Sequence, residues 1–326
     1  MRVAQIGNFD PPHSTENELK KALEANGCVV TPYQEGNIDH WHSLIGALDE
    51  SWEDAPGGGF DFVVWTRTAS ELNKIPDGIQ NRMADFARSA DVPVVGYHLD
   101  IWWDLPRQRE MRTVRYFKLV DFFCSADGGH EKEFAAAGIN HRWFPPGVSE
   151  FECGKGKFDR QFAAPLGFVG CWDGSYHKEW QHRFSLVDHL KGKNARFWPE
   201  LGQHAVRGAP LRDLYASVDV LVGDACLVGS EGHYWSDRVP ETLGRGGVLI
   251  HPRVAGMEDH FEYGEEIEVW DIGDWDALDG LIADLQNDPE RRAELSEAGM
   301  KRVLKDHTYT VRMAQLIEML RTEGRL

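Results

Sequence analysis

The chain has 326 residues, of which 42% are hydrophobic and 27% are charged. This is the composition of an ordinary globular protein, so it excludes disordered and fibrous classes, and the length is sufficient for two domains. The 35 Lys and Arg residues against 53 Asp and Glu residues give a formal net charge of -18. Such a charge disfavours a non-specific grip on nucleic acid or on an anionic membrane.

The cysteines and the N-terminus bear on where the protein acts. The 5 cysteines show no CxxC spacing, and an odd number in a chain of this length is typical of a reducing compartment. The first residues predict a short strand and no signal peptide, and no apolar run approaches the ~20 residues that span a bilayer. We therefore expect a cytoplasmic protein with no integral membrane contact.

Short apolar runs alternate with amphipathic stretches along the first half of the sequence. A capping residue, Ser14 or Thr15, precedes the first helical stretch. Several of the apolar runs are hydrophobic on both faces, which is typical of buried parallel strands with helices on both sides. The predicted strands are 3–6, 28–33, 60–66, 93–98, 120–125 and 141–144, and the predicted helices are 16–26, 78–90, 108–118 and 129–138.

The alternation stops at Pro145-Pro146-Gly147 and resumes near residue 164. We therefore expect two Rossmann-like α/β domains, 1–146 and 164–326, joined by a linker at 147–163. Ligands of such folds bind at the carboxyl ends of the strands, so the two sheets should face each other across a cleft. Strands are predicted at 166–170, 195–198, 218–222 and 247–251, and helices at 178–190, 211–217, 237–244, 275–286, 289–304 and 308–320.

The first strand ends in Gly7-Asn8, and the loop that follows contains His13. This loop is not a GxGxxG turn, so it does not predict a plain dinucleotide site. Backbone N–H groups at the following helix N-terminus could instead receive an anion or a polar substrate. We place Gly7 and Asn8 on the acceptor side of the cleft, although a capped turn of purely structural use fits the same residues.

The strand at 93–98 ends in His98-Leu99-Asp100, followed by Trp102 and Trp103. A strand-end Asp or His can act as a general base or can stabilise positive charge in a transition state. We rank Asp100 first, His98 second and His13 third, and a hydrogen-bonded structural role remains the alternative for each. The two tryptophans could stack on the apolar face of a sugar ring or could belong to the core.

Two further segments carry charge that could bind anions. Residues 107–118 hold five cations and one acid, which could guide an anionic acceptor such as a nucleic acid or a phosphorylated sugar, or could form an ordinary solvated helix face. In the second half, Gly170 follows a strand and precedes a helix that carries Arg183, so a diphosphate could lie on that helix N-terminus.

Arg238 and Glu241 are three residues apart, so they share one face of a predicted short helix. Together they could offer a cation to phosphate oxygens and a carboxylate to a ribose diol. An Arg–Glu surface pair is the alternative interpretation.

Around these residues the sequence resembles the C-terminal domain of GT-B glycosyltransferases, in particular the glycosyltransferase group 1 (family 4-like) set and its spore-protein CgeB-like branch. The main similarity is 234–252, YWSDRVPETLGRGGVLIHP, where an Arg, two residues and a Glu precede a glycine turn and an apolar strand. Shorter matches are LRDLYASVDV at 211–220, GMEDHF at 256–261, WDAL at 275–278, DPERR at 288–292 and HTYT at 307–310.

The resemblance implies a GT-B fold and transfer of a hexose or pentose from a nucleotide-diphosphate sugar, linked to UDP or GDP, with retention of configuration. It implies that Glu241 binds the donor ribose, that Arg238 and Arg183 lie near the diphosphate, and that residues such as His204 and Val206 lie near the nucleobase. It implies no catalytic metal and no further cofactor. The histidine spacings likewise predict no zinc site.

The sequence departs from the family's paired-glutamate pattern, because His233 stands where the first acid is expected. Glu231, two residues earlier, could replace that acid. Alternative functions are a nucleotide-sugar epimerase, an oxidoreductase, or a non-catalytic nucleotide- or carbohydrate-binding protein. The acceptor is left open between a saccharide, a protein and a nucleic acid such as a modified DNA base, and the protein is expected to be a monomer or a homodimer.

Overall fold

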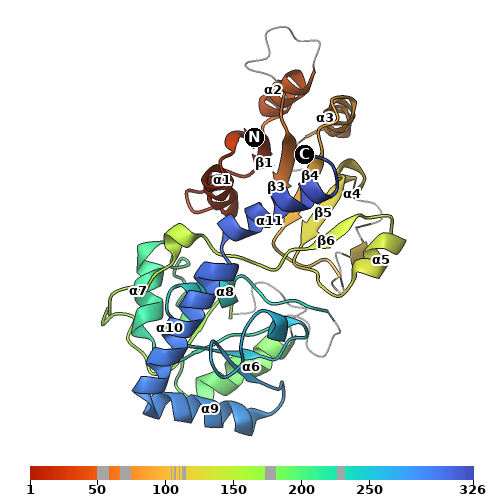
Figure 1. Ribbon diagram of the computed structural model, residues 1–326. Helices are drawn as coiled ribbons and strands as arrows, with labels where there is room; N and C mark the ends of the chain where they lie inside the picture. Colours follow the sequence, from red (N-terminus) through yellow and green to blue (C-terminus); the bar gives the residue numbers. More distant parts are fainter. Residues whose placement is uncertain are drawn as a thin grey trace. The chain divides into compact units, whose positions relative to one another are not determined.

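The structure is a computed structural model that describes residues 1–49, 59–66, 75–103, 105, 108–109, 111, 115–172, 181–225 and 232–326 (Figure 1). It divides into two compact units. The first contains residues 1–144 and 309–326, and the second contains residues 145–308. Each unit is built on its own parallel β-sheet, as the alternation of apolar runs predicted.

The first unit is a six-stranded sheet in the order β2-β1-β3-β4-β5-β6. All its neighbouring strands run parallel. Because β2 and β3 lie on opposite sides of β1, the chain reverses its direction of winding there, and the carboxyl end of β1 borders the usual ligand crevice of such sheets. The strands are β1 (Arg2–Gly7), β2 (Val29–Gln34), β3 (Phe62–Thr66), β4 (Val94–His98), β5 (Phe122–Ser125) and β6 (His141–Trp143).

Helices cover both faces of this sheet, because its strands are apolar on both sides. Along β3, Val63 and Trp65 join one buried cluster, which also includes Trp41 of α2 and Met83 of α3. The alternate residues of β3 join the opposite cluster with helices α1 and α11, and Figure 1 shows this pair of helices together. The helices are α1 (Thr15–Ala25), α2 (Ile38–Leu48), α3 (Asp77–Ser89), α4 (Tyr116–Leu119), α5 (Glu131–Ala136) and α11 (Tyr309–Thr322).

The division of the chain differs from the expected one at two places. Helix α11 returns to the first unit, where Met313, Leu316 and Leu320 are buried against Leu19 and Leu23 of α1. Residues 147–163, expected to be a linker, fall inside the second unit. They are held there by bonds such as that from the backbone N–H of Gly154 to the carbonyl of Gly244, at 2.8 Å.

The second unit is a five-stranded sheet in the order β11-β10-β9-β7-β8. Its order reverses between β7 and β9, so the carboxyl ends of these two strands border its ligand crevice. The strands are β7 (Gly167–Val169), β8 (Arg196–Trp198), β9 (Leu221–Val222), β10 (Leu249–Pro252) and β11 (Glu268–Trp270).

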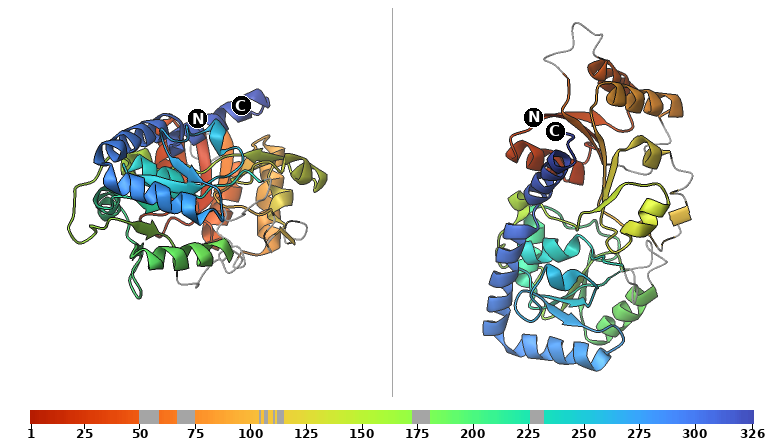
Figure 2. Two further views of the ribbon diagram at one scale, coloured as in Figure 1. Left: turned by 90° about the horizontal axis from the view of Figure 1, so that it is seen from below. Right: turned by 45° about the vertical axis from the view of Figure 1, so that its right-hand side comes forward.

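Helices α6 and α9 bury their apolar residues against this second sheet, in one cluster with Phe168 and Ile250. Asp288 ends α9 and caps α10 through the backbone N–H of Arg291, so the two helices follow one another with a sharp bend (Figure 2). The helices of the unit are α6 (Gln181–Gly192), α7 (Ala209–Ser217), α8 (Arg238–Gly244), α9 (Trp275–Asn287) and α10 (Pro289–Asp306), with short 3-10 turns η3 (Glu150–Glu152) and η4 (Met257–Asp259).

The predicted strands match observed ones to within a few residues, and Ser14 caps α1 as expected, since its side chain accepts the backbone N–H of Asn17. Helix α2 and strand β11 were not predicted. The helix expected at 108–118 is observed only as α4, and part of that range lies outside the described residues. No described helix has the length and apolar character needed to cross a membrane.

Candidate functional site

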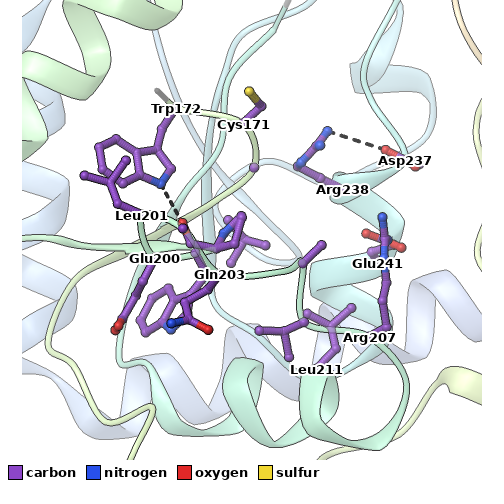
Figure 3. A pocket seen from close by; sticks show the side chains of 17 residues that line it. Cys171, Trp172, Glu200, Leu201, Gln203, Arg207, Leu211, Asp237, Arg238 and Glu241 are labelled. Atoms are coloured by element: carbon purple, nitrogen blue, oxygen red, sulfur yellow. Dashed lines mark hydrogen bonds and ion pairs between the residues drawn. The ribbon is translucent and has the colours of Figure 1, made fainter. Parts of the chain in front are cut away.

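A cavity of about 440 Å³ opens in the second unit beside the carboxyl ends of β7 and β8 and the first turn of α8 (Figure 3). This is the edge of a parallel sheet at which ligands bind, close to the point where the strand order reverses. Its wall consists of Val169, Gly170, Cys171, Trp172, Trp198, Pro199, Glu200, Leu201, Gly202, Gln203, Ala205, Val206, Arg207, Leu211, Asp237, Arg238 and Glu241.

Gly170 turns the chain from β7 into this cavity. Its φ is +153°, and a Cβ at this position would lie 2.9 Å from Nε of Arg238. The absence of a side chain therefore lets the guanidinium lie directly against the turn. The backbone N–H of Gly170 donates to the carbonyl of Trp198 at 2.9 Å, which ties the turn to the end of β8.

Arg238 and Glu241 lie on the first turn of α8, and both line the cavity (Figure 3). A guanidinium nitrogen of Arg238 is 3.7 Å from a carboxylate oxygen of Asp237. Arg207 adds a second guanidinium to the wall. The cavity can therefore offer two cations to an anion, beside a carboxylate that can accept hydrogen bonds from hydroxyl groups.

The carboxyl group of Glu241 is held in a mixed electrostatic environment. Burial and the neighbouring Asp237 raise its pKa above the ordinary value, while Arg245, Arg238 and Arg207 act in the opposite direction. Arg245 is itself buried and donates to the backbone carbonyl of Glu241 at 3.2 Å. A carboxyl on the wall of this cavity can accept hydrogen bonds from the hydroxyl groups of a ligand diol.

One wall of the cavity is apolar and carries an indole. The Nε1–H of Trp172 donates to the carbonyl of Pro199 at 2.8 Å (Figure 3), and its ring lies 5.0 Å from that of Phe197. Because the polar edge of Trp172 is already satisfied, this wall suits the flat face of a base or a sugar. Val206 contributes to the cavity, whereas His204 is exposed and does not line it.

The structure gives Arg183 a different place from the one expected. Its guanidinium is buried and donates hydrogen bonds to both carboxylate oxygens of Asp224, with the Nη2–Oδ1 distance at 3.0 Å. A third bond joins Nη1 to the carbonyl of Cys171 at 3.1 Å. Arg183 therefore does not line the cavity. Its charge is paired with Asp224, which follows β9, and its bond to the carbonyl of Cys171 supports the cavity wall.

In the first unit, Asp100 and His98 share a tight turn after β4. The backbone N–H of Asp100 donates to Nδ1 of His98 at 3.1 Å, and the carboxylate of Asp100 accepts the N–H of Ile101 at 3.1 Å. Both residues are half-buried. The turn continues into the backbone N–H groups of Trp102 and Trp103, which both donate to one oxygen of Asp127, at 2.7 and 2.8 Å.

The two tryptophans differ from each other in their surroundings. Trp102 is 2% exposed and packs edge-on against His98 and Phe117, so it belongs to the core and is not available to stack on a sugar. Trp103 stacks on the ring of His130 at 5.4 Å and lines a second cavity of about 500 Å³. Trp103 is therefore the only one of the pair with a surface that a ligand could reach.

The loop after β1 is fixed by hydrogen bonds of Gln34. Its Nε2–H donates to the side-chain oxygen of Asn8 at 2.9 Å, and its Oε1 accepts the backbone N–H of Phe9 at 2.9 Å. A Cβ on Gly7 would lie 2.4 Å from Cγ of Glu16, so this glycine is required by packing against α1. His13 is exposed on the same loop.

Several expectations lie partly outside the described residues. Glu231, the possible replacement for the missing acid, is among these, as are Arg107 and Arg112 of the basic segment. Arg115 of that segment pairs with Asp77 at 2.8 Å, which reduces the charge it can offer. Within the described ranges, no three His, Cys, Asp or Glu residues come together as metal ligands.

Two acids that organise these turns, Asp127 and Asp224, were not predicted from the sequence. Each stands two residues after the last residue of a strand, as Asp100 does after β4. The position was thus a usable signal, but an acid at a strand end does not show by itself whether it faces a ligand or holds the backbone.

Comparison with known proteins bears on this cavity. Residues 176–318 match the profile of a family described as glycosyl transferase-like. This range includes Arg207, Arg238 and Glu241. No curated protein sequence matches the chain.

Three solved structures illustrate the likeness of the fold. HepE of Anabaena, in complex with UDP and glucose, has a TM-score of 0.59 at 11% identity, covering 99% of this chain and 100% of its own. An alpha-glucosyltransferase in complex with UDP and a 13-mer DNA containing an HMU base has a TM-score of 0.63 at 10% identity, covering 98% and 99%. Sucrose-phosphate synthase of Thermosynechococcus elongatus has a TM-score of 0.57 at 11% identity, covering 99% and 100%.

The resemblance read from the sequence is confirmed at the level of the fold and, over residues 176–318, by the match to the glycosyl transferase-like profile, while the CgeB-like branch stays a prediction. The chain has the GT-B fold of glycosyltransferases, and its residues 176–318 are similar to the glycosyl transferase-like family.

Proposed function

We propose that the protein transfers a sugar from a nucleotide-diphosphate donor, and that the cavity of the second unit binds the nucleotide. The observation that carries the proposal is the placement of Arg238 and Glu241 on one turn of α8, with both lining one cavity together with Gly170. A cation beside a diol-accepting carboxylate matches the diphosphate and ribose of such a donor. The family match over residues 176–318, which include Arg238 and Glu241 but not Gly170, supports this assignment.

The polarity of the cavity suggests how the donor lies in it. The diphosphate would lie at the Gly170 turn and Arg238, the ribose at Glu241, and the base against the wall that contains Val206 and Pro199. UDP is our first choice of nucleotide, because HepE and the alpha-glucosyltransferase were both crystallised with UDP. A GDP-linked donor is the second choice.

Transfer breaks the bond between the anomeric carbon and the β-phosphate oxygen, and an acceptor hydroxyl forms the new bond as its proton leaves. Negative charge then builds up on the departing diphosphate. Arg238 and Arg207 would stabilise that charge without a metal ion. We propose retention of configuration, and we keep a hexose or pentose as the transferred sugar.

The first unit would bind the acceptor. Asp100, at the end of β4, is our first candidate for the group that receives the proton or stabilises positive charge on the sugar, with His98 and His13 as alternatives. Gly7, Asn8 and Trp103 would contact the acceptor, which is a saccharide, a protein or a nucleic acid. The DNA in the alpha-glucosyltransferase complex makes a modified DNA base one of the acceptors to test. We place the reaction in the cytoplasm.

The test is donor turnover. The chain would be incubated with UDP-glucose, UDP-galactose and GDP-mannose, alone and with saccharide, peptide and hydroxymethylated DNA acceptors, and the released nucleoside diphosphate would be measured. We expect release from at least one donor, and a rate of release that is roughly tenfold or more lower in Glu241→Gln. The Glu carboxylate is charged and can accept a ribose hydroxyl on each of its two oxygens, whereas the Gln amide is neutral and has one accepting oxygen.

Asp284→Asn serves as a matched control, because Asp284 lies on α9 and does not line the cavity. Binding of a nucleoside diphosphate without release from any donor would favour a non-catalytic binding protein. A chain that binds NAD and no nucleoside diphosphate would favour an oxidoreductase.

A further inference from the structure

An ion pair lies directly behind the wall of the nucleotide cavity. The side chains of Arg183 and Asp224 are 5% and 1% exposed, and two hydrogen bonds join the guanidinium to both carboxylate oxygens. A buried pair of this kind is weak evidence for stability, because removing both charges from water costs about as much as their attraction returns. We therefore consider whether the pair, placed behind the cavity wall, has a role in ligand binding.

The third hydrogen bond of Arg183 connects the pair to the cavity. Nη1 donates to the backbone carbonyl of Cys171 at 3.1 Å, and Cys171 follows the Gly170 turn. A trans peptide is planar, with its C=O and N–H pointing in opposite directions. Fixing the carbonyl of Cys171 on Arg183 therefore directs the N–H of Trp172 away from Arg183.

The N–H of Trp172 is available for a ligand. The backbone N–H of Trp172 makes no hydrogen bond to a described residue. Cys171 and Trp172 both line the cavity, while Arg183 and Asp224 do not. An amide that points away from Arg183 at this place is directed to the cavity side of the wall.

Asp224 is itself held from a second direction. Nε2 of His251, on β10, lies 3.1 Å from the backbone carbonyl of Asp224, and Nδ1 lies 2.8 Å from the carbonyl of Pro252. A Cβ on Gly223 would lie 2.9 Å from Cδ2 of His251, so the imidazole packs closely on the end of β9. The pair thus anchors the Gly170 turn to both β9 and β10.

We propose that Arg183 and Asp224 form a positioning pair that orients the Cys171–Trp172 peptide so that the N–H of Trp172 donates to a phosphate oxygen of the bound nucleoside diphosphate. The inference rests on the proposed function, since it requires a diphosphate in the cavity. Arg183 also neutralises Asp224, whose carboxylate would otherwise repel the phosphates from beneath the turn.

The experiment compares UDP with uridine by isothermal titration calorimetry on the wild type and on the double variant Arg183→Met/Asp224→Leu. Replacing both charges by apolar side chains of similar size should keep the fold. UDP affinity should fall roughly ten- to hundredfold, because one hydrogen bond to a charged group is lost. Uridine affinity should change less than about twofold, because uridine has no phosphate. A merely structural pair would move both affinities equally or neither.

A matched control is Arg302→Met/Glu266→Leu. This variant removes another two-bond Arg–carboxylate pair of the same unit, with distances of 2.8 and 2.9 Å, away from the cavity. It should leave both affinities unchanged. Equal losses of UDP affinity in the two double variants would overturn the inference.

A second variant keeps the test decisive if the first one does not fold. Arg183→Lys retains the charge opposite Asp224 but lacks the planar fork that also reaches the carbonyl of Cys171. It should again weaken UDP and not uridine. Unchanged UDP affinity in a folded variant would overturn this inference alone. A wild type that binds no nucleoside diphosphate would overturn the proposed function as well.

Discussion

Gly170 lies against the guanidinium of Arg238, and the hydrogen on its Cα leaves room for that contact. In Gly170→Ala the added methyl would fall 2.9 Å from Nε of Arg238, at a backbone φ of +153°. The Arg238 side chain must then move away from the turn. We predict that UDP affinity, measured by calorimetry, falls roughly tenfold or more.

The control for this prediction is Gly264→Ala, where φ is +78° and nothing lies within 4 Å. That variant carries the backbone strain of about 1 kcal/mol without a clash, so its UDP affinity should match the wild type. Equal affinity in both variants would show that Arg238 does not contact the phosphates.

A second residue-scale prediction concerns His141 in the first unit. The ring is 5% exposed and stacks on Phe134 at 4.0 Å. Burial, together with Arg142 and His130, lowers the pKa of His141 to about 3. The unfolded chain therefore binds more protons between the ordinary value of about 6.5 and the lowered pKa, so the free energy of unfolding falls as the pH decreases through that window.

This loss is at most roughly 1.4 kcal/mol per pH unit. In His141→Phe, which keeps an aromatic ring on Phe134 and has no proton to bind, urea unfolding between pH 7 and pH 4.5 should show a shallower dependence on pH. A dependence equal to that of the wild type would mean that His141 titrates normally in the folded unit.

The sequence predicts which side chains share a helix face where their spacing alone determines it. Arg238 and Glu241 are three apart in a helical segment, so their shared face followed from helix geometry. Arg183 was misplaced because a sequence shows a cation near a glycine turn but not the carboxylate of Asp224, 41 residues later, that neutralises it. For Trp102 the sequence left a sugar-stacking position and a core position open, because it does not show that Asp127 holds the backbone N–H of Trp102.

Among the elements, helix α11 lies at the C-terminal end of the sequence but packs against the sheet of the first unit. Leu316 is fully buried in the core of the first unit with Leu19 and Leu23. Leu316→Ala should destabilise that unit by about 2–5 kcal/mol. Hydrogen exchange measured by mass spectrometry should then become faster in peptides from β1, β3 and β4.

The matched control is Leu304→Ala on α10, a residue that is 45% exposed. It should change stability by no more than about 0.5 kcal/mol. Faster exchange confined to residues 145–308 in Leu316→Ala would contradict the assignment of α11 to the first unit.

The regular elements were largely predictable because parallel strands are continuous apolar runs and their helices are amphipathic. Strand β11 escaped because its three residues, Glu268–Trp270, form no apolar run. The sheet against which α11 packs was not predicted either. The pattern of Met313, Leu316 and Leu320 indicates a buried helix face, but it is the same whichever sheet that face covers. Only the packed structure identifies that sheet.

For the whole molecule, we propose that the second unit binds a nucleoside diphosphate through Glu241 and Arg238. The two parallel sheets of six and five strands, the family match over residues 176–318 and the cavity all support this proposal. Length and the alternation of elements predicted this architecture. They could not predict the donor or the acceptor, because both depend on a few side chains in loops.

The most direct test is a thermal-shift panel with UDP, GDP, dTDP, CMP, ADP and NAD on the wild type and on Glu241→Ala. A ligand at ~100 times its dissociation constant adds about 2.7 kcal/mol to the stability of the unit that binds it, which corresponds to a rise of several degrees in melting temperature. We predict such a rise for the wild type with one nucleoside diphosphate, UDP first, and its loss in Glu241→Ala. A rise with NAD alone, or an equal rise in the variant, would contradict the binding of a nucleoside diphosphate through Glu241.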